Sequence, residues 1–149
     1  MCKQNLKEYN FYGWENAECQ AVTDEFKNVK TPKDLYDCLS NIWCAETCAP
    51  RLRASWKEEN KTHGQCSITS FLVQDIFGGE VRGILRKGGT YHCFNVVGDI
   101  EFDLTSEQFG DEKLDYTVYE VQSREEHFSD ADKYSRYLLL KEKLSNYCK

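Results

Sequence analysis

The amino-acid sequence predicts an α+β fold. Apolar residues recur at helical spacing before residue 78, and short runs rich in β-branched and aromatic residues follow. Helices that precede strands in this order pack on an antiparallel sheet instead of alternating with parallel strands. The 149 residues fit a single domain, and the 40% of hydrophobic residues exclude intrinsic disorder for most of the chain.

The domain is expected to consist of an N-terminal extension, residues 1–30, and a core, residues 31–149. The aromatic residues of the extension either cover a groove as a flap or enlarge the core, and we expect the second. These residues are Tyr9, Phe11, Tyr12 and Trp14. The first helix of the core is expected at 32–47, because Thr31 can cap a helix and Pro32 suits its first turn.

The central helix is predicted at residues 65–77. Its apolar residues describe one helical face: Ile68, Phe71, Leu72 and Ile76. Gly78 and Gly79 follow, and glycine is the residue that most easily ends a helix. This helix is therefore expected to lie buried at the centre of the domain.

Strands of an antiparallel sheet are expected at 80–86, 90–97, 100–104 and 116–121. Gly98 and Asp99 would form a two-residue turn between the second and third strands. Residues 105–108 match a capping box for one helical turn. A last helix is expected at 129–146, and it would dock on the body of the domain.

Composition disfavours several classes of function and location. The 19 Lys and Arg against 25 Asp and Glu give a net charge of −6, which disfavours nucleic-acid binding. The longest aliphatic run, 138–140, is too short to cross a membrane, and residues 1–30 lack the apolar region of an export signal. A cytoplasmic protein is therefore expected, with its eight cysteines as free thiols instead of a disulfide framework.

Cys66 is the candidate nucleophile, because it opens the central helix directly after Gly64 and Gln65. The unpaired backbone N–H groups of a helix start stabilise a thiolate and lower the pKa of the thiol. The N–H of Cys66 could also point at an oxyanion. The alternative is an ordinary buried cysteine at the start of a core helix.

His92 and Asp103 are the candidate base and orienting acid. With a two-residue turn at 98–99, the residues that flank the turn pair, and Phe94 comes opposite Asp103. His92 shares a face with Phe94, so Asp103 is its diagonal cross-strand neighbour. A register shift of one residue would send Asp103 to the other face, and Asp99 in the turn is the weaker candidate for the acid.

Cys66, His92 and Asp103 together are the minimum for acyl transfer through a thioester. The imidazole takes the thiol proton, and the carboxylate fixes the imidazole tautomer. Alternatively, His92 is bonded to a backbone carbonyl and Asp103 caps the following turn. The other histidines, His63 and His127, have polar neighbours and are expected to be solvated.

A zinc site is a further alternative, since Cys38, Cys44 and Cys48 lie close together in the sequence. However, no C-x-x-C pair occurs and the three histidines are scattered, which disfavours a metal site. The expected reaction needs neither a metal nor an organic cofactor.

The motifs around these residues resemble those of known cysteine enzymes. Gly64, Gln65 and Cys66 match the G-Q-C around the nucleophile of transglutaminases, and His92 with Asp103 resembles the histidine and acid strand pair of transglutaminase-like and papain-like enzymes. Residues 35–109 resemble more closely the YunG-like family of small bacterial proteins. That resemblance rests on residues 60, 64–75, 78–79, 92–95, 103–105 and 108–109.

The resemblance implies a papain-like core, in which the cysteine helix packs on the sheet that carries the histidine and the acid. It implies a cysteine hydrolase or acyltransferase that acts on a peptide or protein amide, as a peptidase, amidase, deamidase or transglutaminase-like enzyme. Asn60 stands where papain-type enzymes place an oxyanion-binding glutamine, and Gln65 and Trp56 are rival donors. Cys93 and Phe94 replace an aromatic residue and a tryptophan, which are packing changes.

The alternative function is a non-catalytic binding or regulatory module that keeps this fold with an unused triad. The acidic composition and the added N-terminal segment fit a protein-interaction role. No membrane or nucleic-acid partner is expected, and no oligomeric state is assigned.

Overall fold

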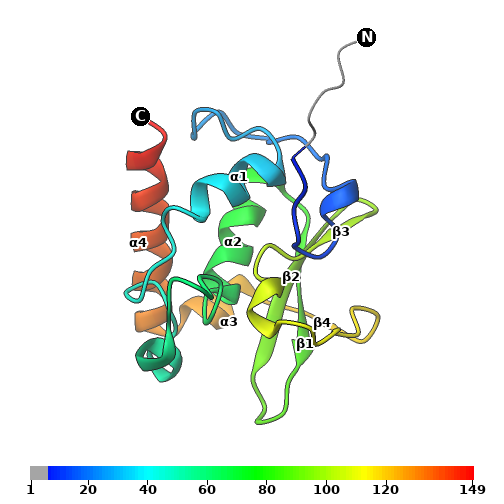
Figure 1. Cartoon of the computed structure of the whole chain (residues 1–149), viewed down its shortest axis with the longest axis vertical. Helices are drawn as coiled ribbons and strands as arrows, with labels where there is room; N and C mark the ends of the chain where they lie inside the picture. Colours follow the sequence, from blue (N-terminus) through cyan, green and yellow to red (C-terminus); the bar gives the residue numbers. More distant parts are fainter. Residues whose placement is uncertain (1–6) are drawn as a thin grey trace.

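A sheet of four antiparallel strands forms one side of the molecule and helices form the other (Figure 1). The structure is a computed structural model that describes residues 7–149. The strands are β1 (Glu80–Leu85), β2 (Tyr91–Val97), β3 (Ile100–Phe102) and β4 (Glu120–Val121). The α-helices are α1 (Pro32–Leu39), α2 (Cys66–Phe77), α3 (Arg124–Phe128) and α4 (Ala131–Tyr147), and short 3-10 helices are η1 (Trp14–Asn16), η2 (Pro50–Ser55) and η3 (Ser106–Phe109). The prediction of an α+β fold is confirmed.

The sheet has the strand order β3-β2-β1-β4, and the register of its β2–β3 hairpin is the predicted one. Val97 pairs with Ile100 across the turn at 98–99, and Asn95 pairs with Phe102. On its other side, β2 pairs with the whole length of β1, and β4 adds a short edge strand to β1. This register meets the structural condition on which the candidate site depends.

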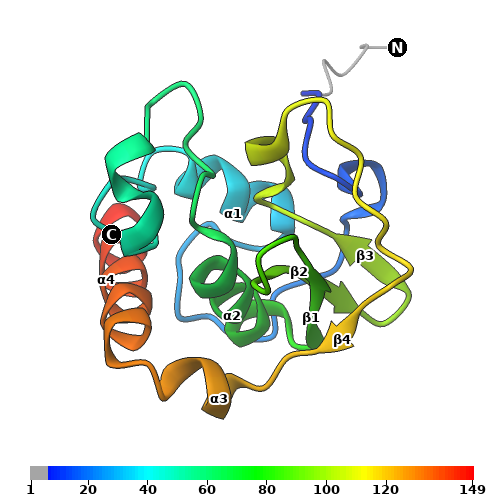
Figure 2. The ribbon, with the colours of Figure 1, turned by 90° about the horizontal axis from the view of Figure 1, so that it is seen from below.

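Helix α2 lies at the centre of the molecule, packed against β2 on one side and against α4 on the other (Figure 2). The four side chains predicted for its buried face are fully buried: Ile68, Phe71, Leu72 and Ile76. Gly78 follows the helix at a φ of 81°, a backbone conformation that residues with a side chain rarely adopt. The prediction of a central helix is therefore confirmed.

The N-terminal segment is integrated into the core over residues 7–30. Phe11 is fully buried within the main hydrophobic cluster. The Asp103 N–H donates a hydrogen bond to the Tyr12 carbonyl at 3.0 Å, which ties the segment to the chain that leaves β3. The described part of the extension thus enlarges the core, and residues 1–6 of the predicted extension lie outside the described residues.

The first helix is shorter than predicted. Thr31 caps its start as expected, but α1 ends at Leu39 and residues 40–47 form turns. The Thr47 hydroxyl accepts a hydrogen bond from the Cys44 N–H at 3.1 Å and donates one to the Cys44 carbonyl at 3.0 Å. Such local side-chain bonds satisfy the backbone in place of helical bonds, so the prediction of a helix through residue 47 was wrong.

The elements after β3 also differ from the prediction. The last strand is only two residues long, because Asp115 accepts hydrogen bonds from both the N–H and the hydroxyl of Thr117 and so forms a turn before it. The last helix, α4, begins after Asp130, whose carboxylate accepts from the Lys133 N–H. Sequence reasoning missed α3, which precedes it and which Ser123 caps.

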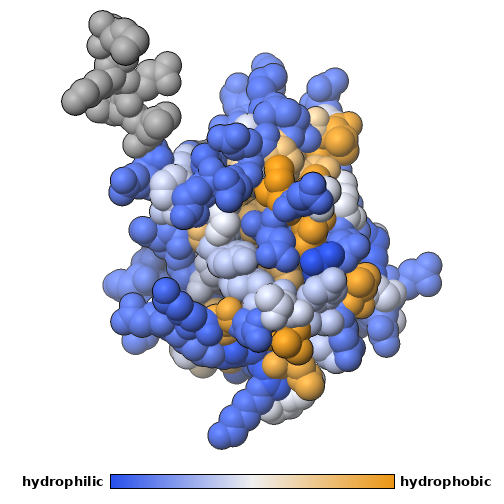
Figure 3. Space-filling view, turned by 90° about the vertical axis from the view of Figure 1, so that its right-hand side faces the viewer, coloured by the Kyte–Doolittle hydropathy of each residue, from blue (hydrophilic) through white to orange (hydrophobic). Residues whose placement is uncertain are grey.

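The surface is mainly hydrophilic on the face drawn in Figure 3, with apolar residues interspersed. Charged residues make up 30% of the chain, which accounts for the hydrophilic areas. Across residues 7–149, none of the helices combines the length and the apolar character needed to span a bilayer.

Candidate active site

His92 and Asp103 meet in a buried hydrogen bond. His92 lies on β2 and Asp103 directly follows β3, and His92 Nε2 is 2.6 Å from Asp103 Oδ2. The two side chains are 2% and 1% exposed, so water does not compete for this contact. Asp99, the weaker candidate for the acid, lines a different pocket at the turn, so the acid beside His92 is Asp103.

Three further donors hold the Asp103 carboxylate. The Tyr116 hydroxyl donates to Oδ2 at 2.8 Å, and the N–H and hydroxyl of Thr105 donate to Oδ1 at 3.1 and 3.2 Å. These bonds stabilise a buried charge and fix its orientation. Because Thr105 donates to Asp103, it does not cap η3, and the predicted capping box at 105–108 was wrong.

Asp103 determines the charge of His92. Burial alone would lower the pKa of His92, but the charge and hydrogen bond of Asp103, followed by those of Cys66, outweigh burial and raise this pKa to about 10. His92 is therefore an imidazolium at neutral pH. Its second ring nitrogen, Nδ1, is buried and has no hydrogen-bond partner within residues 7–149. This nitrogen is the one that His92 can offer to a reactant.

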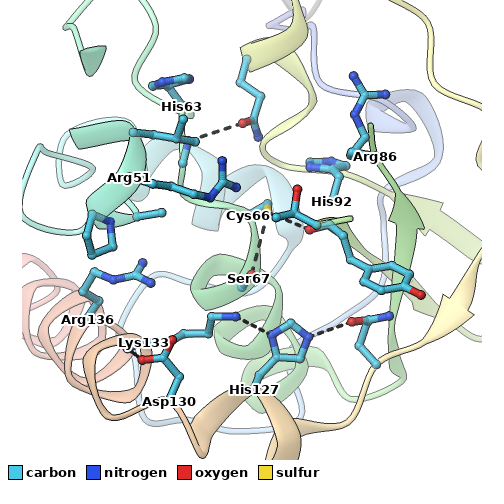
Figure 4. Close-up of a pocket in the computed structure, with 18 of the residues that line it drawn as sticks. Arg51, His63, Cys66, Ser67, Arg86, His92, His127, Asp130, Lys133 and Arg136 are labelled. Atoms are coloured by element: carbon cyan, nitrogen blue, oxygen red, sulfur yellow. Dashed lines mark hydrogen bonds between the residues drawn. The ribbon is translucent and has the colours of Figure 1, made fainter. Parts of the chain in front are cut away.

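Cys66 opens α2 and lies half-buried in the same pocket as His92 (Figure 4). Its sulfur is 3.9 Å from the Ser67 hydroxyl oxygen and 4.0 Å from the Tyr91 carbonyl oxygen. The Cys93 thiol and then His92 stabilise the thiolate, and together they outweigh burial and hold the pKa of Cys66 well below its ordinary value. Among the described residues, no hydrogen bond joins this sulfur to His92 Nδ1.

The other thiols have different surroundings. The cysteines between residues 7 and 149 are free, and burial raises the pKa of four of them: Cys19, Cys38, Cys48 and Cys148. The cysteines considered as zinc ligands belong to no group of three or more metal-binding side chains within the part of the chain that the structure describes. Cys66 therefore differs from them in both its position and its low pKa.

The pocket over Cys66 and His92 has a volume of about 980 Å³. One wall comes from η2 and α4 and carries Arg51, Lys133 and Arg136, and His92 lies on the opposite side (Figure 4). A pocket of this volume lies at the upper end of the range for small-molecule sites. The candidate nucleophile is thus accessible to a substrate.

His127 lines the pocket together with His92 and His63, and the prediction that it is solvated was wrong. It is half-buried, its Nε2 lies 2.8 Å from Gln122 Oε1, and its Nδ1 lies 2.9 Å from the Lys133 ammonium nitrogen. Burial, followed by the charge of Lys133, lowers the pKa of His127. Its Nδ1 then accepts from Lys133. The sequence gives no signal for this contact, because it depends on how α3 and α4 pack.

The three side chains considered as oxyanion donors have other partners. The amide of Gln65 is buried and donates to the Cys44 carbonyl at 3.0 Å. The Trp56 indole donates to the Lys61 carbonyl at 3.0 Å, and the Asn60 amide lies 3.5 Å from the Gln108 carbonyl oxygen. None of the three lines the pocket over Cys66. The backbone N–H groups in the first turn of α2 have no partner within the helix, so they remain as candidate oxyanion donors.

Comparison with known proteins gives two matches. The model of a family described as "YunG protein" matches residues 31–149. A relative from Bacillus subtilis (strain 168), "Uncharacterized protein YunG", is 34% identical over 94 residues, which cover 63% of this chain and 78% of the relative. No solved structure matches significantly.

Proposed function

The chain belongs to the YunG protein family, and we propose that it is a thiol-dependent amide hydrolase or acyltransferase. The observation that carries the proposal is the buried 2.6 Å bond between His92 and Asp103, in the same pocket as the half-buried thiol of Cys66. Cys66 is the nucleophile, His92 the acid and base, and Asp103 the group that orients His92.

The first half of the reaction forms a thioester. The Cys66 thiolate attacks the carbonyl carbon of the amide, and the carbonyl electrons move onto the oxygen. Backbone N–H groups in the first turn of α2 stabilise this oxyanion. His92 gives its Nδ1 proton to the amide nitrogen, the C–N bond breaks, and the amine leaves.

The second half releases the acyl group. Neutral His92 takes a proton from a water molecule or an amine through Nδ1 while that molecule attacks the thioester carbonyl. The C–S bond then breaks and the Cys66 thiolate is restored beside the imidazolium. Water gives a hydrolase and an amine gives an acyltransferase. The substrate is a peptide or protein amide that reaches the thiol through the pocket.

We also propose that the core is papain-like. In support of this, the helix that carries Cys66 packs on β2, which carries His92, and the acid follows the neighbouring strand. Cys66 lies at the start of a helix and His92 on a strand, and two such rigid elements favour the fixed geometry that the proposed reaction needs.

The test is alkylation of Cys66 at pH 5.5 to 6, where an ordinary thiol is protonated. The intact protein is treated with iodoacetamide, and the modified cysteines are identified by peptide mass spectrometry. Cys66 is expected to react about tenfold faster or more than Cys19, a half-buried thiol whose pKa burial raises. Cys66→Ser removes the fast reaction, and Cys19→Ser keeps it.

An amide-based electrophilic probe then tests acyl transfer. In the wild-type chain, the probe is expected to form an adduct on Cys66 whose mass corresponds to the thioester. In His92→Gln, no such adduct is expected to accumulate. If Cys66 reacts with iodoacetamide no faster than Cys19, the nucleophile is refuted, and a non-catalytic binding module becomes the better reading. If both alkylation and adduct formation survive in His92→Gln, His92 has no role in the chemistry.

A further inference from the structure

One wall of the pocket is cationic although the chain as a whole carries a net charge of −6. Arg51 from η2 and Lys133 and Arg136 from α4 line this wall, and Figure 4 shows them on the side of Cys66 that is opposite His92. Two elements that are far apart in the sequence therefore bring their positive charges to one side of the thiol.

The charges of Arg51 and Lys133 are not neutralised by ion pairs. Among residues 7–149, neither side chain makes a salt bridge with a carboxylate. The Lys133 ammonium instead lies 2.9 Å from Nδ1 of His127, whose pKa is lowered, so its partner is a neutral imidazole. These two cations remain free to bind an anion.

Arg136 differs because it is built into the wall. It is 7% exposed, its Nε lies 2.8 Å from Asp132 Oδ2, and its Nη1 donates to the Thr47 carbonyl at 3.3 Å. A buried and doubly bonded guanidinium keeps a fixed position. Its role is to hold the cationic wall in shape, since its charge is compensated by Asp132.

Four carboxylates also line the pocket, and their bonds within the protein decide whether they can pair with the cations: Glu120, Glu126, Asp130 and Asp132. Glu120 accepts a hydrogen bond from the Tyr91 hydroxyl at 2.8 Å, and Asp130 accepts from the backbone N–H of Lys133 as the cap of α4. Asp132 is paired with Arg136, and Glu126 is exposed on the rim. Three of these four carboxylates are already bonded within the protein, whereas Arg51 and the ammonium of Lys133 face the pocket without an anionic partner.

The position of His92 decides which part of a substrate meets this wall. His92 protonates the leaving amine, so the amine must lie on the His92 side of Cys66. The acyl portion then extends to the opposite side, toward Arg51 and Lys133. We propose that the site accepts amides whose acyl portion carries a carboxylate, and that Arg51 and Lys133 bind this carboxylate. This inference rests on the proposed function, because it assumes that Cys66 is the nucleophile.

Two alkylating reagents that differ only in charge provide the test. Iodoacetate and iodoacetamide both react when the thiolate displaces iodide from a CH₂ group, but iodoacetate carries a carboxylate. The ratio of their second-order rate constants at Cys66, measured at pH 7 by peptide mass spectrometry, is compared with the ratio for glutathione. Because both reagents use the same thiolate, changes in its pKa cancel in the ratio. The ratio at Cys66 is expected to exceed that of glutathione by about tenfold.

Variants separate the wall from the charge of His92, which also attracts an anion. Arg51→Gln and Lys133→Gln are each expected to reduce the ratio severalfold, and 0.5 M salt should reduce it in the wild-type chain as well. Lys27→Gln is the matched control, because Lys27 is exposed and does not line this pocket. Circular dichroism of each variant confirms that the fold is retained.

The outcomes distinguish the two proposals. A wild-type ratio equal to that of glutathione, or a high ratio that both Gln variants keep, overturns the carboxylate site while leaving Cys66 as the nucleophile. If Cys66 reacts slowly with both reagents, the proposed function fails, and this inference fails with it. A high ratio that falls in both Gln variants and persists in Lys27→Gln establishes the site.

Discussion

His92 and Asp103 share a 2.6 Å hydrogen bond in which neither side chain is more than 2% exposed. The pair comes from β2 and from the residue that follows β3, so the hairpin register holds it together. A buried imidazole keeps a proton at neutral pH only if a negative charge compensates the loss of hydration. The charge state of His92 therefore depends on Asp103.

Replacing the acid should change the charge of His92 at neutral pH. In Asp103→Asn, the carboxylate that chiefly opposes burial is gone and only Cys66 still raises the pKa of His92, so this pKa should fall far enough below about 10 to leave the imidazole neutral at pH 7. The neutral imidazole cannot protonate the leaving amine, and amide turnover should fall on the order of 10³-fold to 10⁴-fold. A ¹⁵N NMR titration of His92 measures the pKa. An unchanged titration curve would refute the role of Asp103.

Tyr116 should act as a positioning residue for the acid. Its buried hydroxyl donates to Asp103 Oδ2 at 2.8 Å, and burial, followed by the charge of Asp103, raises its pKa, so it stays protonated. Tyr116→Phe should cost about 1.5–3 kcal/mol of unfolding free energy, since it removes a hydrogen bond to a charged group. With one donor fewer on the carboxylate, the pKa of His92 should not fall.

Tyr119→Phe is the matched control for this substitution. Tyr119 is 39% exposed, and its hydroxyl makes no hydrogen bond within residues 7–149. The unfolding free energy of the Tyr119→Phe variant should differ from that of the wild-type chain by less than about 0.5 kcal/mol. Equal losses in the two variants, measured by urea denaturation, would contradict the structural role of the Tyr116 bond.

The pairing of His92 with Asp103 could be predicted from the sequence because the period of a strand is two residues. Once the two-residue turn at 98–99 fixes the register, the side of the sheet that each side chain occupies follows. The start of α2 at Cys66 was predictable for a similar reason, since apolar spacing and the two glycines delimit the helix. Local sequence patterns therefore predict both the pairing of His92 with Asp103 and the position of Cys66 at the start of α2.

The parts that could not be predicted depend on competition or on packing. Residues 40–47 have helical apolar spacing, but the Thr47 hydroxyl binds the backbone of Cys44 and competes with a helix. The contact of His127 with Lys133 requires the angle between α3 and α4, which no pattern in the sequence encodes. The same holds for the cationic wall, whose charges come from η2 and α4.

The pH dependence of the proposed reaction should follow from the two opposite pKa shifts. The reactive form contains the Cys66 thiolate and the His92 imidazolium. The pKa of Cys66 is lowered, so as pH rises the thiolate forms at a pH well below that at which ordinary thiols ionise. The pKa of His92 is raised to about 10, so amide turnover should decline as pH rises through that value. A pH–rate profile with its alkaline limb near 7 would contradict this assignment.

Cys93 should support the thiolate from inside the protein. It is fully buried on β2, its sulfur lies 3.9 Å from the Ser67 hydroxyl oxygen, and its thiol is the strongest influence that lowers the pKa of Cys66. In Cys93→Ala, the pKa of Cys66 should therefore rise, and alkylation by iodoacetamide at pH 6 should slow severalfold. Cys148→Ala, at a buried thiol outside the pocket, should leave the rate unchanged. Equal rates in both variants would show that Cys93 has only a packing role.

The N-terminal segment should be needed for stability even though the family match begins at residue 31. Phe11 is fully buried, and its ring centroid lies 5.0 Å from that of Tyr36 on α1. Phe11→Ala should reduce the unfolding free energy by about 3–5 kcal/mol, because it leaves a cavity in the main core. Val22→Ala, at a side chain that is 72% exposed in the same segment, should change it by less than about 0.5 kcal/mol. Urea denaturation measures both values. If Phe11→Ala proves as stable as Val22→Ala, residues 7–30 are a surface appendage and the core is complete without them.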